Sequence, residues 1–293
     1  MEILCLGCTG FVGTAVRRAL CDAGHRLLVV SRLSTPSPHK NESWISIESD
    51  WMDHLCKVDA LVNFAGEPIS RFWLSDEVNN AIRGSRVGLC SRIVDRLGRM
   101  GSFPTVWINA SAVGIYGNRG EEILTEAAGP GKGYLAEVCS EWEGEVERCV
   151  HFGTREVRLR LGPVLGKGGL LRQLEPVYRM GLGGRIGSGE QYVPWVHLED
   201  VVRATLFALE NQSMRGPCNV VSPGIVRQKD FSRSLGLAWR SRVQISLPEY
   251  VVNHLPGTLT ELMAFSQRAI PEALQQNGFR FVQTNLDECL ADV

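Results

Sequence analysis

The chain has 293 residues, enough to bury a substantial core, and its 44% hydrophobic and 22% charged residues are ordinary for a globular protein. A formal net charge of -1 provides no basic field, so nucleic acid is not expected as a partner. No apolar run approaches the roughly 20 residues of a membrane span, and the chain opens on a strand pattern rather than a signal segment, which predicts a cytoplasmic protein without a membrane partner.

The first half of the chain alternates short apolar runs with helical periodicity, as βαβ units do. Strands are predicted over 3–6, 26–31, 59–64, 106–111 and 156–161. Helices are predicted over 12–23, 87–97 and 135–149. Parallel strands joined by helices through right-handed crossovers give an α/β fold with a doubly wound parallel Rossmann sheet.

The second half has weaker patterns. Residues 162–189 are rich in glycine and are expected to form loops and short helices, and a helix is predicted over 201–209. From about Leu247 the pattern changes to short helices punctuated by proline. The sequence therefore predicts a main domain over 1–215 and a smaller α+β C-terminal lobe over 245–293.

The sequence GCTGFVG directly after the first strand indicates a nucleotide-binding turn. Gly7 permits a tight turn, Gly10 lets the backbone approach a pyrophosphate, and Gly13 lets the helix pack closely on the sheet. Amide groups at the helix start then hold the phosphates. Glycines also gather in turns that bind nothing, but the strand before this turn and the helix after it favour a dinucleotide.

The end of the second strand refines the identity of the dinucleotide. An NAD site usually has an acidic residue about 20 residues beyond the glycines, to bond the ribose hydroxyls. This chain has Ser31 and Arg32 there, and a guanidinium can bond a 2′-phosphate in bidentate fashion and stack on adenine. The sequence therefore predicts NADP(H), the alternative being that Arg32 is a surface arginine that ends a strand.

Cysteines and histidines indicate no metal site and no disulfide framework. The nine cysteines have no regular spacing, and the CxxC pair of Cys5 and Cys8 has no second CxxC beside it. Cys5 lies in the first strand pattern and Cys8 in the glycine turn, which favours structural roles. The six histidines show neither HxxH nor HExxH spacing, so no metal is predicted.

Several further motifs follow in order: NFAG, AGEPIS, GSR, SAVGIYG, EWE, RLGPVLGKGG, GLGGRIGSGEQYVPWVHLEDVV and SQRAIPEALQQNGFRF. Together they resemble the extended short-chain dehydrogenase/reductase superfamily, and within it an atypical NAD-dependent epimerase/dehydratase-like family with a small C-terminal domain of unknown function. The resemblance covers essentially the whole chain. It implies a Rossmann domain that holds NADP(H), with no established substrate, and a lid or substrate segment over about 163–200.

The resemblance also implies which positions contact the cofactor. The pyrophosphate turn would consist of Gly7, Thr9, Gly10, Phe11, Val12 and Gly13. Ser31 and Arg32 would take the 2′-phosphate. Adenine and ribose would be lined by Phe64, Ala65, Gly66 and Glu67. Arg86 would be a further contact, and Pro163 and Val164 would lie beside the nicotinamide.

Hydride transfer in the superfamily uses a hydroxyl, a tyrosine acid/base and a lysine four residues after the tyrosine. Ser111 fits the hydroxyl and Tyr134 fits the tyrosine, but Val138 stands where the lysine is expected. An apolar valine supplies neither positive charge nor hydrogen bonds to the ribose. Two functions stay open: an NADP(H)-dependent oxidoreductase or epimerase acting on a small polar or sugar-like substrate, and a catalytically impaired NADP(H)-binding sensor or interaction module.

The GSGEQYVPWVHLED block contains the candidate substrate contacts Gln191, Trp195 and His197. The alternative for this block is a structural role, in which His197 is an interior histidine and the nearby Asp200 caps the following helix. Arg268 in SQRAIP is predicted as either an anion contact or a salt-bridge partner. Related folds often form homodimers through a four-helix interface, for which the helices over 87–97 and 135–149 are candidates.

Overall fold

The computed structural model describes residues 1–32, 39–69, 76–241, 245–252, 254 and 257–291. Packing divides the chain into two compact units. Unit 1 comprises Met1–Ser111, Ser140–Leu159 and Val202–Cys218. Unit 2 comprises Ala112–Cys139, Arg160–Val201 and Asn219–Val293. The predicted domains over 1–215 and 245–293 are stretches of sequence rather than packing units, and their bounds stay a prediction.

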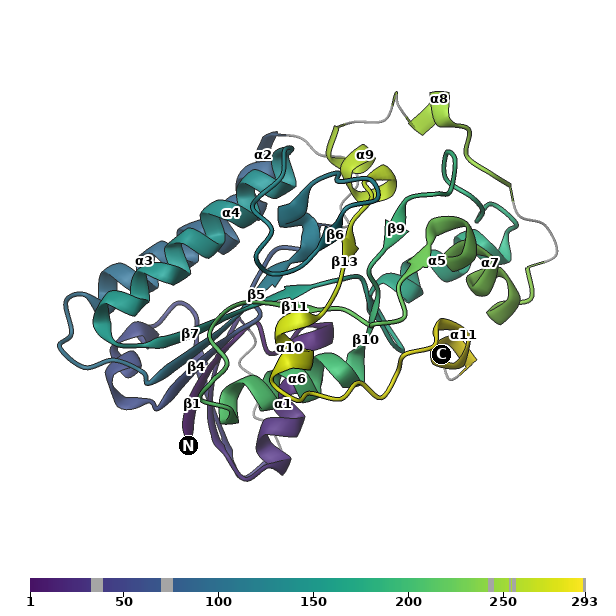
Figure 1. The fold of residues 1–293 in the computed structure, drawn as a ribbon. Helices are drawn as coiled ribbons and strands as arrows, with labels where there is room; N and C mark the ends of the chain where they lie inside the picture. The colour runs from purple at the N-terminus through teal and green to yellow at the C-terminus, as the bar shows by residue number, and fades with distance from the viewer. Residues whose placement is uncertain (33–38, 70–75, 242–244, 253, 255–256, 292–293) are drawn as a thin grey trace. The chain divides into compact units, whose positions relative to one another are not determined.

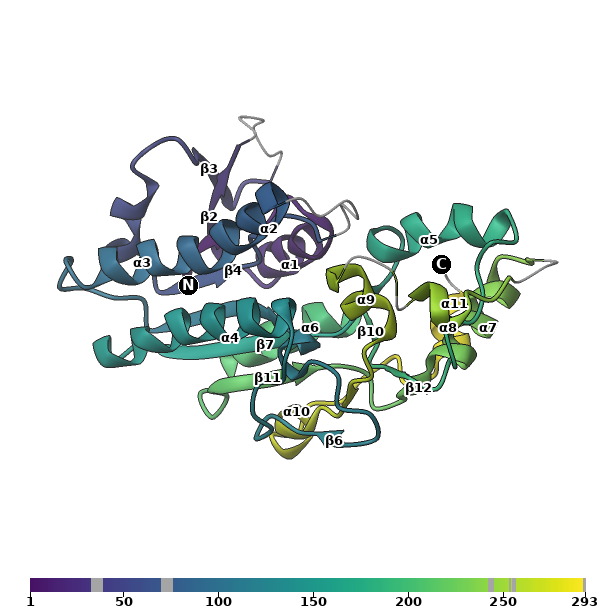
Figure 2. The same ribbon diagram turned by 90° about the horizontal axis from the view of Figure 1, so that it is seen from above.

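A seven-stranded sheet with the order β11-β7-β5-β4-β1-β2-β3 organises the fold (Figure 2). Its strands are β1 (Glu2–Leu6), β2 (Arg26–Ser31), β3 (Glu42–Ser46), β4 (Ala60–Asn63), β5 (Val106–Ala112), β7 (Arg155–Leu161) and β11 (Gly216–Val220). β1 pairs in parallel with β2 and β4, and the pairs β2–β3 and β4–β5 are also parallel. The predicted α/β fold with a doubly wound parallel sheet is confirmed.

Helices cover both faces of this sheet, which is why its central strands are apolar runs. In Figure 1, α3 and α4 lie on one side of the strands, and α1 and α6 lie on the other. The bounds are α1 (Phe11–Asp22), α3 (Leu89–Leu97), α4 (Tyr134–Glu147) and α6 (Leu198–Glu210). These helices correspond to the four that the periodicity predicts.

The sequence patterns did not single out β3, β11 or α7 (Gln228–Ala238), and they gave only unplaced short helices for the stretch that holds α5 (Gly169–Arg179). β3 is an edge strand without a fully buried residue, so its side chains do not form an apolar run. α5 lies in the glycine-rich stretch, where glycines obscure its period. A further helix, α2 (Asp76–Arg83), precedes α3, and a π-helical turn over Gly84–Gly88 joins the two.

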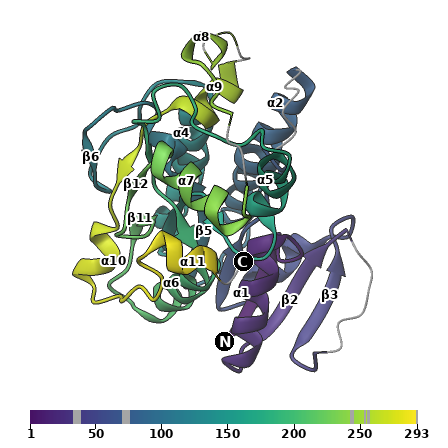
Figure 3. The same cartoon turned by 90° about the vertical axis from the view of Figure 1, so that its right-hand side faces the viewer.

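Unit 2 has its own apolar core, formed where α5 and α7 pack with α11 (Leu286–Ala291) (Figure 3). Its other helices are α8 (Glu249–Val252), α9 (Gly257–Ala264) and α10 (Glu272–Gln276). Its two-residue strands pair as β8 (Val164–Leu165) with β10 (Val196–His197), β9 (Tyr192–Val193) with β12 (Val226–Arg227), and β6 (Ile123–Leu124) with β13 (Arg268–Ala269). Shorter 3-10 turns span Trp51–Lys57, Val113–Tyr116 and Arg148–Phe152.

Among the residues that the structure describes, no helix combines the length and the apolar character that a membrane span requires.

A buried cluster of charges joins α4 to β7 within unit 1. The Arg158 guanidinium donates to both Glu156 carboxylate oxygens, at 2.9 and 3.0 Å. It also lies 3.3 Å from Glu147 and 3.6 Å from Glu143. Burial raises the pKa of Glu156, and Arg158 acts in the opposite direction. One guanidinium thus compensates the charge of several carboxylates, two of which are themselves buried.

Replacing Arg158→Met should destabilise the protein by about 3–5 kcal/mol at pH 7, because buried carboxylates lose their countercharge. The pKa of Glu156 would rise further above the ordinary 4.5. A carboxyl group with a raised pKa in the folded state costs stability as the pH rises, so the deficit should shrink as the pH falls toward 4.5. Urea denaturation at pH 7 and pH 5 measures both effects.

Arg148→Met is the matched control for this prediction. Arg148 pairs with Glu145 and Asp95 on the surface, where ion pairs contribute about 1 kcal/mol or less. An equal loss of stability in both variants, or a deficit independent of pH, would contradict the interpretation of the Arg158 cluster.

Candidate functional site

The glycine turn after β1 is held by contacts between backbone groups. Gly7 has a φ of +68°, and a Cβ there would overlap the backbone of Phe64 and Ala65. A Cβ at Gly13 would overlap the Gly7 carbonyl and Cys8. Both glycines are therefore required by the fold of unit 1 itself, since any side chain would push the turn away from β4 or lift α1 from the turn.

Gly10 differs from the other two glycines. It is exposed and N-caps α1 with a φ of -78°, a conformation open to any residue. An added Cβ would meet only the Gly7 carbonyl oxygen, at an ordinary 3.5 Å. No side chain among the described residues caps α1. None of the described residues of unit 1 requires a glycine here, whereas a ligand approaching the first-turn amides would.

β2 ends at the two residues predicted to recognise a 2′-phosphate. Ser31 is buried, and its carbonyl accepts from the Ile47 amide at 3.0 Å. Arg32 follows the strand and is exposed. The guanidinium thus stands at the carboxyl end of the parallel strands, the edge of an open sheet at which ligands bind.

The turn that follows β4 is fixed by a pair of buried asparagines. Asn63 donates to Asn109 Oδ1 at 2.7 Å, across adjacent strands, and its own Oδ1 accepts from the Ala65 amide at 2.9 Å. This holds the chain of Phe64–Glu67 against Gly7. Phe64, Ala65 and Glu67 are half-buried and Gly66 is exposed, so the segment is accessible from the carboxyl edge of the sheet.

Arg86 projects from the π-helical turn toward the same segment. Its guanidinium donates to the Glu67 carbonyl at 3.1 Å and lies 5.4 Å from the centre of the Trp142 ring. A Cβ at Gly66 would come within 2.8 Å of the guanidinium. The insertion of a π-turn, a feature frequent at functional sites, is what aims Arg86 in this direction. The structure therefore brings Arg86 together with Phe64–Glu67.

Ser111 lies buried near the end of β5. Its hydroxyl donates to Glu143 of α4 at 2.6 Å, and Glu143 is itself 3% exposed. Because the only hydroxyl proton points to a carboxylate, Ser111 can accept a hydrogen bond from a further group but cannot donate one. The Arg158 cluster stabilises the negative charge of Glu143.

Tyr134 is the first residue of α4 and is half-buried. Val138, one helical turn later, is 2% exposed and packs as an apolar residue. Burying a charged group at this position without a partner would be costly, so an apolar residue agrees with the burial of the site.

The short β8–β10 pair brings predicted nicotinamide and substrate residues together in unit 2. Pro163 and Val164 are half-buried, Val164 pairs with Val196, and His197 pairs with Leu165. His197 Nδ1 accepts from the Glu199 amide at 3.3 Å. In a neutral His197 the proton therefore resides on Nε2, which leaves a donor for a ligand.

The other two predicted substrate contacts donate hydrogen bonds to backbone carbonyls of unit 2. Gln191 donates to the carbonyls of Ile186 and Met263 at 3.1 and 3.2 Å. Trp195 is fully buried, and its indole N–H donates to the Gly224 carbonyl at 2.8 Å. Trp195 thus packs in the apolar core of unit 2, and a contact between it and a substrate stays a prediction.

The structure shows the contacts of Asp200 and Arg268, for which the sequence left more than one role open. α6 begins at Leu198, so Asp200 lies inside its first turn rather than at the predicted cap, and its carboxylate accepts from the Val282 and Gln283 amides at 2.9 Å. Arg268 lies 5.1 Å from the centre of the Tyr192 ring and 3.5 Å from the Glu121 carbonyl.

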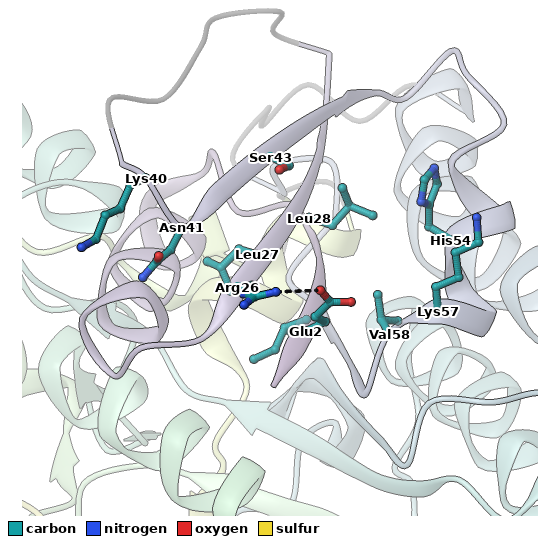
Figure 4. A pocket seen from close by; sticks show the side chains of 11 residues that line it. Glu2, Arg26, Leu27, Leu28, Lys40, Asn41, Ser43, His54, Lys57 and Val58 are labelled. Atoms are coloured by element: carbon teal, nitrogen blue, oxygen red, sulfur yellow. Dashed lines mark ion pairs between the residues drawn. The ribbon is translucent and has the colours of Figure 1, made fainter.

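A cavity of about 300 Å³ lies at the amino ends of β1 and β2 (Figure 4). Glu2 and Arg26, which form an ion pair at 3.7 Å, line it together with His54 and Lys57. Parallel strands place their amino ends at one edge of a sheet, so this cavity is remote from the glycine turn at the carboxyl end of β1. It is not part of the predicted site.

Within the described ranges, no group of three or more His, Cys, Asp and Glu side chains is arranged to hold a metal ion. Cys5 and Cys8 are fully buried thiols. A hydrogen bond with Cys8, together with burial, raises the pKa of Cys5 well above its ordinary value, which disfavours the reactive thiolate.

Comparison with known proteins identifies the family. Residues 3–222 match the NAD dependent epimerase/dehydratase family. The chain belongs to this family. Residues 247–293 match a domain of unknown function, DUF1731.

Similar proteins in the family span nearly the whole chain. An epimerase family protein of Mycobacterium leprae is 34% identical over 97% of this chain and 93% of its own length. The chloroplastic SDR39U1 homolog of Arabidopsis thaliana is 34% identical over 96% of this chain and 83% of its own length. The crystal structure of human SDR39U1 (isoform 2) with NADPH has a TM-score of 0.84 and 28% identity, covering 100% of this chain and 99% of that one.

The sequence patterns of this epimerase-family chain predict no role for Glu143, Arg158 or Glu261. Glu143 had a readable signal, since it follows Ala136 and Cys139 at helical spacing and thus stands on the buried face of α4. A charged residue at such a position requires a buried partner. No sequence signal pointed to Glu261, because the residues whose amides it accepts hydrogen bonds from are distant in the sequence.

Gly7→Ala should lower the free energy of unfolding by about 3 kcal/mol or more, because a left-handed φ and a backbone overlap act together. Gly10→Ala should change it by less than about 1 kcal/mol, since alanine fits the N-cap conformation. Thermal and urea denaturation of the two variants compare these effects. Similar losses would show that Gly10 is also required by the fold.

Proposed function

We propose that this epimerase-family protein binds NADP(H) and acts as an oxidoreductase or epimerase on a small polar or sugar-like substrate. The observation that carries the proposal is Gly10, which lies at the start of α1 without a side-chain cap and which no contact with the described residues of unit 1 requires to be a glycine. The NADPH in the human SDR39U1 structure supports the same cofactor here.

The described residues fit a dinucleotide phosphate. Its pyrophosphate would bind the amides of the turn formed by Gly7, Thr9, Gly10, Phe11, Val12 and Gly13. Ser31 and Arg32 would bind the 2′-phosphate, for which the exposed guanidinium supplies a bidentate donor. Phe64, Ala65, Gly66, Glu67 and Arg86 would line adenosine and ribose, and Pro163 and Val164 would lie beside the nicotinamide.

Bound NADP(H) supplies hydride transfer. In the proposed mechanism the Tyr134 phenol donates a proton to the substrate oxygen. Ser111, whose own proton is directed to Glu143, accepts a hydrogen bond from a substrate hydroxyl and so orients it. His197 offers Nε2–H as a substrate donor, and Gln191 is a second candidate contact.

The alternative function is an NADP(H)-binding sensor or interaction module without turnover. Val138 favours it, because a buried valine at this position cannot supply the charge that a lysine gives to the tyrosine and the ribose. A screen of small carbonyl compounds and sugar derivatives, followed by the absorbance of NADPH, separates the two functions. Thermal stabilisation by NADPH with no turnover in the screen would support the sensor.

Arg32→Ala should weaken NADPH binding by about 10- to 100-fold, the loss of a charge-assisted contact, and should change NADH binding by less than about threefold. Isothermal titration calorimetry measures both affinities. Arg18→Ala, at an exposed arginine of α1, is the control and should leave them unchanged. Equal weakening of both dinucleotides by Arg32→Ala would remove the 2′-phosphate assignment.

Gly10→Ala should weaken NADPH and NADH alike, by at least about tenfold, because its methyl group occupies the approach of the pyrophosphate. The variant is expected to fold as stably as the parent, so calorimetry on the folded protein isolates the effect on binding. Unchanged affinity in a folded Gly10→Ala protein would show that the dinucleotide does not bind at this turn.

A further inference from the structure

The C-terminal region contributes one carboxylate to the start of α4. Glu261 of α9 accepts from two consecutive amides: Tyr134 N–H donates to its Oε1 and Leu135 N–H to its Oε2, both at 2.9 Å. Amides in the first turn of a helix have no partner within the helix, and negative charge is favourable there. Glu261 therefore fixes the backbone of the residue that begins α4.

The chain makes room for this contact at Gly133. Its φ of +119° is a conformation that residues with a side chain rarely adopt, and an added Cβ would lie 2.7 Å from Glu261 Oε1. Gly133, which precedes Tyr134, therefore leaves the space that the Glu261 carboxylate occupies.

The segment that follows Glu261 binds two further loops of unit 2. The Met263 carbonyl accepts from Gln191, at 3.2 Å. Ser266 donates its hydroxyl to the Gly120 carbonyl at 2.7 Å and accepts from the Tyr192 amide at 3.1 Å. β13 then pairs with β6. The strip Glu261–Ala269 is thereby bonded to the start of α4 and to both of these loops.

We propose that Glu261 is a positioning residue for Tyr134, through which the C-terminal domain completes the substrate side of the site. This rests on the proposed function, in which Tyr134 donates a proton. Tyr134 is the terminal residue of its helix, where an unsupported backbone frays. Two hydrogen bonds that Glu261 accepts from backbone amides hold that backbone, and the phenol keeps one orientation as a result. The domain of unknown function thereby acquires a role in the reaction without touching the substrate.

A role in stability alone predicts a different pattern from positioning. A helix cap that served only the fold would lower the stability of the whole protein when removed. Positioning requires a change confined to Tyr134 and the first turn of α4, with cofactor binding preserved.

The test uses the full chain labelled with 3-fluorotyrosine, whose five tyrosines give five fluorine resonances. Tyr134→Phe assigns the resonance of interest, and the buried Tyr116 and Tyr178 serve as internal references. In Glu261→Ala the Tyr134 resonance should shift and broaden while both references stay in place. Glu261→Gln, which retains one acceptor oxygen, should be intermediate. Leu262→Ala, at a neighbouring side chain that is 45% exposed, is the matched control and should leave the spectrum unchanged.

Hydrogen exchange and binding complete the experiment. Amides at the start of α4 should exchange about tenfold faster or more in Glu261→Ala, and those of α1 should not change. The affinity for NADPH should stay within about twofold of the parent value. Gly133→Ala should reproduce the Glu261→Ala spectrum, since it displaces the same carboxylate. With a substrate from the NADPH screen, Glu261→Ala should lower kcat more than it raises KM.

Two outcomes would overturn the inference. One is a Tyr134 resonance and a first-turn exchange rate that Glu261→Ala leaves unchanged. The other is a change spread over all five resonances together with uniformly faster exchange, which would assign Glu261 to stability alone. Failure of the parent protein to bind NADPH would count against the proposed function instead, and the fluorine spectra would still decide whether Glu261 orients Tyr134.

Discussion

Direct contact between backbone groups at the carboxyl end of β1 is the constraint on which unit 1 depends. Gly7 lies against Phe64 and Ala65, and Gly13 lies against Gly7, so no side chain fits at either position. This contact sets where α1 begins, and hence where its unpaired amides are presented. The asparagine pair of β4 and β5 fixes the opposing turn from the other side. A ligand site at this edge follows from how the backbone packs.

A buried network of charged side chains is the second feature that stabilises unit 1. Arg158 compensates carboxylates from both α4 and β7, and one of them, Glu143, accepts a hydrogen bond from the Ser111 hydroxyl. The same network therefore supports the sheet and determines what hydrogen bonds Ser111 can make. Val138, at the position where the resemblance predicts a lysine, is buried, and the Glu143 carboxylate fixes the direction of the Ser111 hydroxyl.

Unit 2 is organised by its C-terminal strip. Residues 261–269 follow a stretch of short helices with little periodicity, yet their hydrogen bonds reach the start of α4 and two loops distant in sequence. Membership of the NAD dependent epimerase/dehydratase family accounts for residues 3–222, and the C-terminal domain adds a part that the family match does not describe. Its contacts give that domain a physical connection to the residue proposed to donate the proton.

Local patterns were enough to predict the doubly wound sheet, its main strands and helices, the glycine turn and the place of Arg32 after β2, because these depend on periodicity and on sterics within a few residues. They did not determine the partner of Ser111, the burial of Trp195, or the cap on α4. Ser111 and Glu143 are 32 residues apart, and Tyr134 and Glu261 are 127 apart. Such contacts form only when the chain is folded, because no local pattern specifies which distant carboxylate will satisfy a given hydroxyl or amide.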